Sequence, residues 1–179
     1  WMSSPFGKVA VVARGERICR IIFKDSTKTM LSSLEDLYPQ ATETSSGLIA
    51  AALKQLVEYF HGERRYFTLL LDNSELSHFS SIVQTQLLSV PFGSSVTYGE
   101  LASKAGSPGA ARAVGTVMSS NPFPLLVPCH RVVRSDGDIG GYSSGVEKKI
   151  MLLSAEGVEI KGRKVLNFEQ TLFLFDFKK

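Results

Sequence analysis

The sequence predicts a mixed α/β protein with two domains: a small β-sheet with a helix in residues 1–75, and a mostly helical domain with a helix-turn-helix in residues 76–179. Two observations predict this division. Early in the chain, β-branched apolar runs are separated by turn residues, whereas later the apolar residues recur at every third or fourth position, as in helices. The polar, turn-prone stretch 72–75 lies between the two patterns and places the domain boundary.

The first domain opens with a predicted β-hairpin. Residues 7–13 are largely apolar and β-branched, a turn follows at 14–16, and residues 18–23 form a second strand-like run. Apolar residues at helical spacing then predict a helix over 48–60, which ends at a His-Gly pair. The apolar run 66–71 predicts a further strand.

The second domain is predicted to be mostly helical. One apolar face predicts a helix over 79–90, which ends before a proline. Thr97 is a favourable N-cap for a helix over 98–104, and an alanine-rich helix over 110–118 follows a Ser-Pro-Gly turn. Two short helices joined in this way form either a DNA-binding helix-turn-helix or an ordinary helical hairpin, and the pattern alone does not separate the two.

The charge of the chain is nearly balanced, with 20 Lys and Arg against 17 Asp and Glu, which gives +3. Residues 1–75 hold 9 basic and 9 acidic side chains, and residues 76–179 hold 11 and 8, so the surplus lies in the second domain. This is a weak indication of an anionic partner there. No apolar run approaches the roughly 18 residues of a membrane span, and we expect neither a membrane association nor a secretory signal.

The cysteine count favours free thiols. Two cysteines, Cys19 and Cys129, are too few for a disulfide framework, which points to a reducing, intracellular compartment, cytoplasmic or nuclear. Cys19, His61 and His78 do not form a convincing ligand set, so we expect no metal and no cofactor.

The stretch 125–133 carries the most reactive chemistry, because it places a thiol, an imidazole and a guanidinium in a row at Cys129, His130 and Arg131. A lone buried cysteine is usually inert, so a reactive Cys129 needs an activator that lowers its pKa. If the stretch is an extended strand, neighbouring side chains face opposite ways. A Cys129–His130 interaction then requires a bent backbone or a bridging water. Arg131 is expected to be structural.

Two further segments complete the candidate chemistry. Residues 137–145 contain four glycines and form a flexible loop, either on the surface or where the backbone must approach a ligand closely. A helix around Ile150 and Leu153 then ends near Glu156, which is either a solvated side chain or the third member of a Cys-His-Glu relay.

These motifs resemble those of the O6-alkylguanine-DNA alkyltransferases, in order and in spacing. The resemblance is dense from about residue 79 to residue 157 and thins to a hairpin-plus-helix outline before residue 75. The residues that carry it are Val96-Thr97-Tyr98, Ala111-Arg112-Ala113-Val114-Gly115, Asn121-Pro122, Pro128-Cys129-His130-Arg131-Val132, Gly140-Gly141-Tyr142-Ser143 and Glu156-Gly157. The resemblance implies a ribonuclease H-like first domain and a winged-helix-like second domain.

The resemblance implies a repair reaction that each protein molecule performs once. Cys129 takes the alkyl group from O6 of guanine in DNA, His130 removes the thiol proton through a water, and Glu156 orients His130. Tyr98 gives a proton to the departing guanine, and Asn121 holds the turn between the recognition helix and the active-site strand.

The resemblance also implies how DNA is bound. A monomer is expected to bind double-stranded DNA in the minor groove, independently of sequence, and to flip the damaged base out of the stack. Arg112 fills the space that the base leaves. The other residues expected at the DNA interface are Thr97, Ala110, Ala111, Ala113 and Gly115.

The resemblance predicts a pocket for the flipped base that tolerates groups larger than methyl. The residues expected to form it are Met118, Pro124, Val132, Gly140, Tyr142, Ser143 and Ser144. The phenylalanine-rich tail 168–179 departs from the family pattern, and it either folds back onto the protein or binds a partner.

Two rival functions remain open on the sequence alone. One is a DNA-binding relative that recognises alkylguanine without chemistry, which the presence of Cys129 disfavours. The other is a thiol hydrolase that turns over with Cys129, His130 and Glu156.

Overall fold

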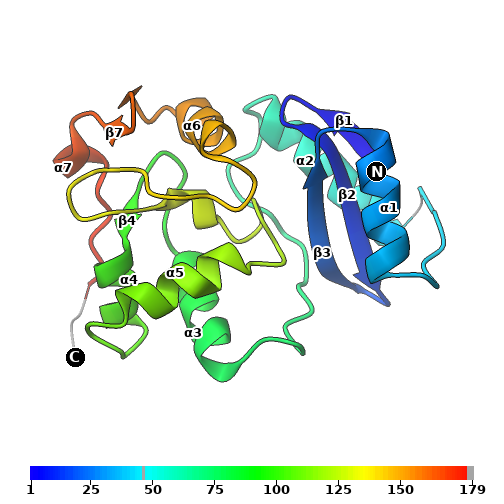
Figure 1. The fold of residues 1–179 in the computed structure, drawn as a ribbon, viewed down its shortest axis with the longest axis horizontal. Helices are drawn as coiled ribbons and strands as arrows, with labels where there is room; N and C mark the ends of the chain where they lie inside the picture. The colour runs from blue at the N-terminus through cyan, green and yellow to red at the C-terminus, as the bar shows by residue number, and fades with distance from the viewer. Residues whose placement is uncertain (46, 177–179) are drawn as a thin grey trace. The chain divides into compact units, whose positions relative to one another are not determined.

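The computed structural model describes residues 1–45 and 47–176, and its contacts divide the chain into two units, Trp1–Asn73 and one that begins at Ser74 (Figure 1). The first unit contains a small sheet with helices, and the second is mostly helical. The mixed α/β class predicted from the sequence is therefore confirmed. No helix in the described ranges is long and apolar enough to cross a membrane.

The sheet of the first unit has three antiparallel strands in the order β1-β2-β3. They are β1 (Met2–Ser4), β2 (Gly7–Arg14) and β3 (Arg17–Lys24). The turn between β2 and β3 contains Gly15 at φ 57°, a conformation that glycine adopts without steric cost. The predicted hairpin is confirmed, whereas β1 had no sequence prediction.

Two helices accompany this sheet. Helix α1 (Thr27–Leu37) begins at Ser26, whose side chain accepts a hydrogen bond from a backbone N–H of the first turn. Its Met30 is fully buried against Ala10 and Ile22 of neighbouring strands. Helix α2 (Gly47–Phe60) confirms the helix predicted over 48–60 and packs against β1 and β2.

The strand predicted over 66–71 is wrong. In the described chain this segment makes a single parallel bridge, between Leu71 and Ile18, and no ladder. Its backbone bonds to a side chain first and reaches β3 only at its end: the N–H of Thr68 donates to Oε1 of Gln55 at 2.9 Å, and the carbonyl of Leu70 accepts the N–H of Ile18 at 2.8 Å. A side chain of α2 thus takes the place of a strand partner at Thr68, and pairing with β3 begins only at Leu70.

The second unit is built mainly from helices, with two short pairs of strands. Its helices are α3 (His78–Leu87), α4 (Tyr98–Lys104), α5 (Ala111–Ser119), α6 (Val146–Ala155) and α7 (Phe168–Thr171). Its strands are β4 (Val96–Thr97), which pairs in parallel with β5 (Val132–Val133), and β6 (Ile160–Lys161), which pairs antiparallel with β7 (Lys164–Val165).

Helices α4 and α5 form the two-helix motif predicted from the sequence. Thr97 caps α4 as predicted: its hydroxyl accepts the N–H of Glu100 at 3.1 Å, and the Glu100 carboxylate accepts the N–H of Thr97 at 3.2 Å. Gly106 and Gly109, at φ 75° and 86°, form the turn to α5. Helix α3 packs against both α4 and α5, which supports the pair from behind.

The tail folds back onto the second unit as far as Asp176. The N–H of Ser95 donates to the carbonyl of Thr171 at 2.8 Å, and the N–H of Phe173 donates to the carbonyl of Ser95 at 2.7 Å. Phe175 is buried beneath the ammonium group of Lys104. The last three tail residues, 177–179, lie outside the described residues.

Candidate functional site

The backbone at the candidate nucleophile is bent, which is one of the two alternatives that the sequence left open. Cys129–Arg131 form a 3₁₀ helix, η1, closed by a hydrogen bond from the N–H of Arg131 to the carbonyl of Pro128 at 2.9 Å. The strand β5 begins only at Val132. This bend is one of the two conditions that the sequence set for a Cys129–His130 interaction. Both side chains are buried, at 3% and 0% exposure.

A tight turn precedes η1 and holds Cys129 in place. Leu125 adopts φ 73°, which is unusual for a side chain of this size and requires support from its surroundings. Asn121 supplies that support from both of its polar atoms. Its Nδ2 donates to the carbonyl of Val127 at 2.9 Å, and its Oδ1 accepts the N–H of Phe123 at 3.0 Å.

A buried charged cluster lies behind Cys129. Glu156, at the C-cap of α6, accepts hydrogen bonds from Nε and Nη2 of Arg131, both at 2.8 Å, and lies 2.9 Å from Nε2 of His130. Arg131 also donates from Nη1 to the carbonyl of Val90 at 2.7 Å. Burial opposes ionisation of Glu156. The hydrogen bonds from His130 and Arg131 and the permanent charge of Arg131 outweigh burial and hold the Glu156 pKa well below its usual range.

These contacts determine how His130 is protonated. Burial lowers the pKa of His130, against the opposing effect of Glu156, so the ring is neutral near pH 7. Because Nε2 faces a carboxylate, the proton of the neutral ring sits on Nε2, and Nδ1 carries a lone pair. Among the described residues, no hydrogen-bond partner reaches this buried Nδ1. Nδ1 is therefore in the state of a proton acceptor.

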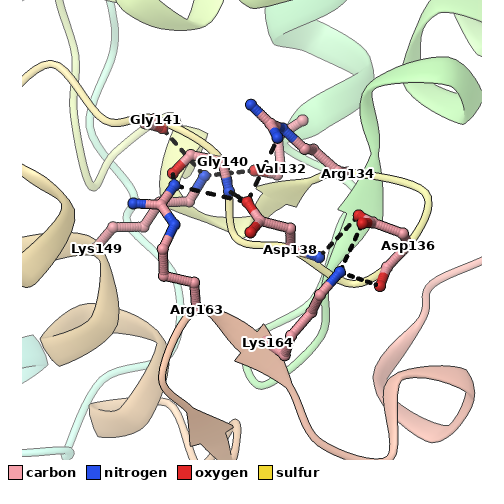
Figure 2. Close-up of polar contacts among 9 residues, drawn as sticks. All are labelled: Val132, Arg134, Asp136, Asp138, Gly140, Gly141, Lys149, Arg163 and Lys164. Carbon is pink, nitrogen blue, oxygen red and sulfur yellow. Dashed lines mark hydrogen bonds and ion pairs between the residues drawn. The ribbon is translucent and has the colours of Figure 1, made fainter.

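Lys149 places a second buried cation beside Cys129. Its ammonium group donates to the carbonyls of Val132, at 2.6 Å, and Gly141, at 3.4 Å (Figure 2). Burial lowers the pKa of Lys149 to about 8, although the nearby Cys129 and Asp138 raise it. Burial also disfavours the charged form of Cys129 and so raises the pKa of its thiol. The hydrogen bond from Asn121 and the charge of Lys149 lower this pKa. The thiol therefore needs a base to react near neutral pH.

Cys129 opens onto a cavity of about 290 Å³, close to the lower end of the range for small-molecule sites. Its lining residues are Tyr98, Gly115, Met118, Ser119, Cys129, Gly141, Tyr142 and Ser143. Burial raises the pKa of the Tyr98 phenol, so this group stays protonated and can donate. A thiol, a phenol and glycine backbone thus face one space.

The residues predicted to form the pocket divide into two groups. Those that line the cavity are Met118, Tyr142 and Ser143. Those outside the lining are Pro124, Val132, Gly140 and Ser144. Val132 instead gives its carbonyl to Lys149, and Gly140 packs behind the lining against Tyr98.

The residues predicted at the DNA interface differ in exposure. Arg112 and Ala113 are exposed on α5, and the preceding alanines are half-buried. Gly115 lines the cavity on the same helix. Thr97 is buried at 8% exposure, and its hydroxyl is held by the capping bonds to Glu100. The exposed surface of α5 therefore adjoins the cavity, whereas Thr97 belongs to the frame of α4.

Sequence reasoning missed three contributions to this site. Arg131 is a principal partner of Glu156, Lys149 lies behind the loop, and Ser119 lines the cavity. Lys149 could have been found, because it shares the buried face of α6 with Leu152 and Leu153. In the described ranges, no three His, Cys, Asp or Glu side chains lie together as a metal site requires.

Comparison with known proteins gives consistent matches. The family model described as the 6-O-methylguanine DNA methyltransferase DNA-binding domain matches residues 78–158, and that of the ribonuclease-like domain matches residues 1–73. A methylated-DNA–protein-cysteine methyltransferase from Mycobacterium leprae is 37% identical over 155 residues, which cover 87% of this chain and 89% of the relative. One from Methanothermobacter thermautotrophicus is 36% identical over 80% of this chain and 81% of the relative. Among solved structures, Mycobacterium tuberculosis OGT in complex with DNA aligns with a TM-score of 0.74 and 33% identity, over 87% of this chain and 89% of that one.

Proposed function

The chain belongs to the 6-O-methylguanine DNA methyltransferases, and we propose that it repairs DNA by moving the alkyl group of O6-alkylguanine onto Cys129. The observation that carries this proposal is the position of Cys129. Its thiol lines a cavity in front of the buried cluster of His130, Arg131 and Glu156. A nucleophile, a base in the accepting state and an orienting carboxylate are the parts that such a transfer requires.

The chemical step begins with deprotonation of the thiol. Neutral His130 takes the proton at Nδ1, through a bridging water, while Glu156 keeps the proton on Nε2 and stabilises the imidazolium that forms. The Cys129 thiolate then attacks the alkyl carbon, so that a sulfur–carbon bond forms as the O6–carbon bond breaks. The electron pair of the broken bond leaves with guanine. A thioether has no further leaving group to expel, so each protein molecule reacts once.

Tyr98 completes the proton balance of this step. Its phenol lines the cavity beside Cys129, and its raised pKa keeps it protonated until charge develops on guanine. Donation to N3 of the departing base lets guanine leave as a neutral molecule. The proton that guanine gains offsets the one that His130 removes from the thiol, and transfer between His130 and Tyr98 restores both groups.

We propose that DNA binds along the exposed surface of α5. The small side chains Ala110, Ala111 and Ala113 allow close approach to a sugar-phosphate backbone in the minor groove, where binding is independent of sequence. Arg112 enters the stack in place of the flipped base, which occupies the cavity next to Cys129. A monomer suffices for this reaction, because one chain supplies every group that it uses.

A stoichiometric end point tests the proposed function. With excess O6-methylguanine duplex, we expect one restored guanine per protein molecule and none with Cys129→Ala. Continued turnover would instead identify a thiol hydrolase, and DNA binding without any restored guanine would identify a non-reacting relative. Either of these results contradicts the proposal.

Arg112→Ala is expected to slow repair of duplex DNA by about 10- to 100-fold, because the variant cannot fill the space left by the flipped base. Reaction with free O6-benzylguanine should stay within about twofold of the wild type, since a free base needs no flipping. The two rate constants are measured on the same preparation, so the free base is the internal control. Equal losses with both substrates would refute the role of Arg112.

A further inference from the structure

Residues 141–143 form one wall of the cavity. A β-hairpin contacts the loop just before this wall, and it lies after the part of the chain that the DNA-binding family model matches. That match ends at residue 158, and the hairpin consists of β6 (Ile160–Lys161) and β7 (Lys164–Val165). Arg163 lies in the turn between these two strands. Its side chain is half exposed, at 49%, and its guanidinium reaches back to the loop that precedes the cavity wall.

Both polar groups of the Gly140 backbone are engaged at this point (Figure 2). The N–H of Gly140 donates to Oδ1 of Asp138 at 2.8 Å, and its carbonyl accepts a hydrogen bond from Nη2 of Arg163 at 3.0 Å. The same Nη2 lies 3.6 Å from Oδ1 of Asp138. Asp138 therefore holds the peptide unit before the Gly140 Cα, Arg163 holds the one after it, and the two side chains attract one another. We call Arg163, Asp138 and the backbone of Gly140 the clamp.

The position of Gly140 matters because it separates the clamp from the cavity. Gly140 adopts φ 71°, and a Cβ at this position would lie 3.3 Å from the phenolic oxygen of Tyr98. The next residue, Gly141, lines the cavity and gives its carbonyl to Lys149. A displacement of Gly140 would thus change both the space beside Tyr98 and the cavity wall.

The hairpin that carries Arg163 is itself fixed to the body of the second unit. The N–H of Ile139 donates to the carbonyl of Arg163 at 2.9 Å, and the N–H of Val165 donates to the carbonyl of Gly137 at 3.0 Å. Ile139 and Val165 belong to one buried apolar cluster together with Leu153 of α6. The backbone of Arg163 is therefore anchored, so its side chain acts from a fixed point.

We propose that Arg163 is a positioning residue for the base pocket: through the clamp it fixes the wall at residues 141–143 and thereby sets how tightly the alkylated base binds. Arg163 touches neither the thiol nor the buried cluster that activates it. Loss of the clamp is therefore expected to weaken binding of the base more than it slows the chemical step. The identity of the bound base rests on the proposed function, whereas the role of Arg163 in fixing the loop rests on the structure alone.

The test compares Arg163→Ala with Lys164→Ala, using free O6-benzylguanine so that contacts to DNA play no part. Lys164 is the matched control, because it carries a similar charge on the same hairpin and its ammonium group bonds to Asp136, at 2.6 Å, whereas the guanidinium of Arg163 bonds to Gly140. For Arg163→Ala we expect the half-saturating concentration KI to rise about fivefold, the effect of one lost hydrogen bond, with the maximal rate kinact within about twofold. Lys164→Ala should change neither constant, and both variants should melt within a few degrees of the wild type.

Hydrogen exchange of the backbone amides of residues 140–143 provides a readout that needs no alkyl transfer. We expect faster exchange in Arg163→Ala and unchanged exchange in Lys164→Ala. Unchanged exchange in Arg163→Ala, an equal rise of KI in both variants, or a fall of kinact without a rise of KI would overturn the inference. If the wild type takes up no benzyl group but hydrogen exchange is faster in Arg163→Ala than in Lys164→Ala, the role of the clamp is supported and the proposed function is contradicted.

Discussion

Glu156→Gln is expected to slow alkyl transfer by about 10²- to 10³-fold, the contribution of a positioned general base. The carboxylate accepts four hydrogen bonds: Oε1 from His130 and Arg131, and Oε2 from Arg131 and from the N–H of Gly93. An amide replaces one of these oxygens with an NH₂ group. In either orientation the NH₂ meets a donor of Arg131, and in one it also faces Nε2 of His130. A donor at Nε2 favours the tautomer with the proton on Nδ1, which cannot accept the thiol proton.

DNA binding should change much less than alkyl transfer in this variant, by threefold or less, because DNA contact is assigned to the exposed surface of α5. The rate is measured by single-turnover transfer and the affinity by fluorescence anisotropy, both below the melting temperature of the variant. Glu159→Gln is the control, since Glu159 is exposed three residues further along the chain. A parallel loss of affinity and rate, or an unchanged rate, would contradict the relay.

Arg131→Met is expected to lower the free energy of unfolding by about 3–5 kcal/mol, because it leaves the Glu156 carboxylate buried without its principal partner. Methionine keeps an apolar chain of similar length, so the lost charge and the lost donors dominate the effect. Arg134→Met is the control: Arg134 is 63% exposed and lies 3.9 Å from Asp138, so its loss should cost at most about 1 kcal/mol. Chemical denaturation of both variants at pH 7 gives the comparison, and equal destabilisation would refute the assignment.

The pH dependence of this loss has a definite sign. In the wild type the Glu156 pKa lies below its ordinary value of 4.5, so its stabilising contribution is complete above that pH and declines as the pH falls further. In Arg131→Met, Glu156 stays buried without the guanidinium, and we expect its pKa to rise. Protonation of Glu156 as the pH falls then removes the buried charge and stabilises the variant. The difference in unfolding free energy should therefore be largest near neutral pH. It should begin to narrow above pH 4.5, as Glu156 of the variant is protonated, and narrow further below pH 4.5, as the wild type loses its contribution. A difference that widens on acidification would point to another cause.

The predictable parts of the fold are those in which one local pattern dominates. The hairpin at β2 and β3 and the helices α2, α4 and α5 follow from apolar spacing and turn residues. The run 66–71 has the same apolar character, but at Thr68 its backbone bonds to the side chain of Gln55, and it reaches β3 only at Leu70, which no local pattern reveals. Helix α1 was not predicted, although it carries readable signals in its N-cap, Ser26, and its buried Met30.

The candidate site was predictable where chemistry lies within a motif and unpredictable where it depends on distant pairing. Cys129 and His130 stand together in the sequence, but the direction of His130 depends on the bend at η1. Glu156 meets His130 only because that bend faces the end of α6. The spacing of Lys149 to Leu152 and Leu153 places it on the buried face of α6, but its bond to the distant carbonyl of Val132 could not be read from the sequence.

The most direct test of the account is the mass of the peptide that contains Cys129 after the protein has reacted with one equivalent of O6-methylguanine duplex. We predict a gain of about 14 Da, the difference between a methyl group and the hydrogen it replaces, located on Cys129 and matched by restored guanine in the DNA. Cys129→Ala should gain no mass and leave the lesion intact. Restored guanine with an unmodified Cys129 would contradict the account.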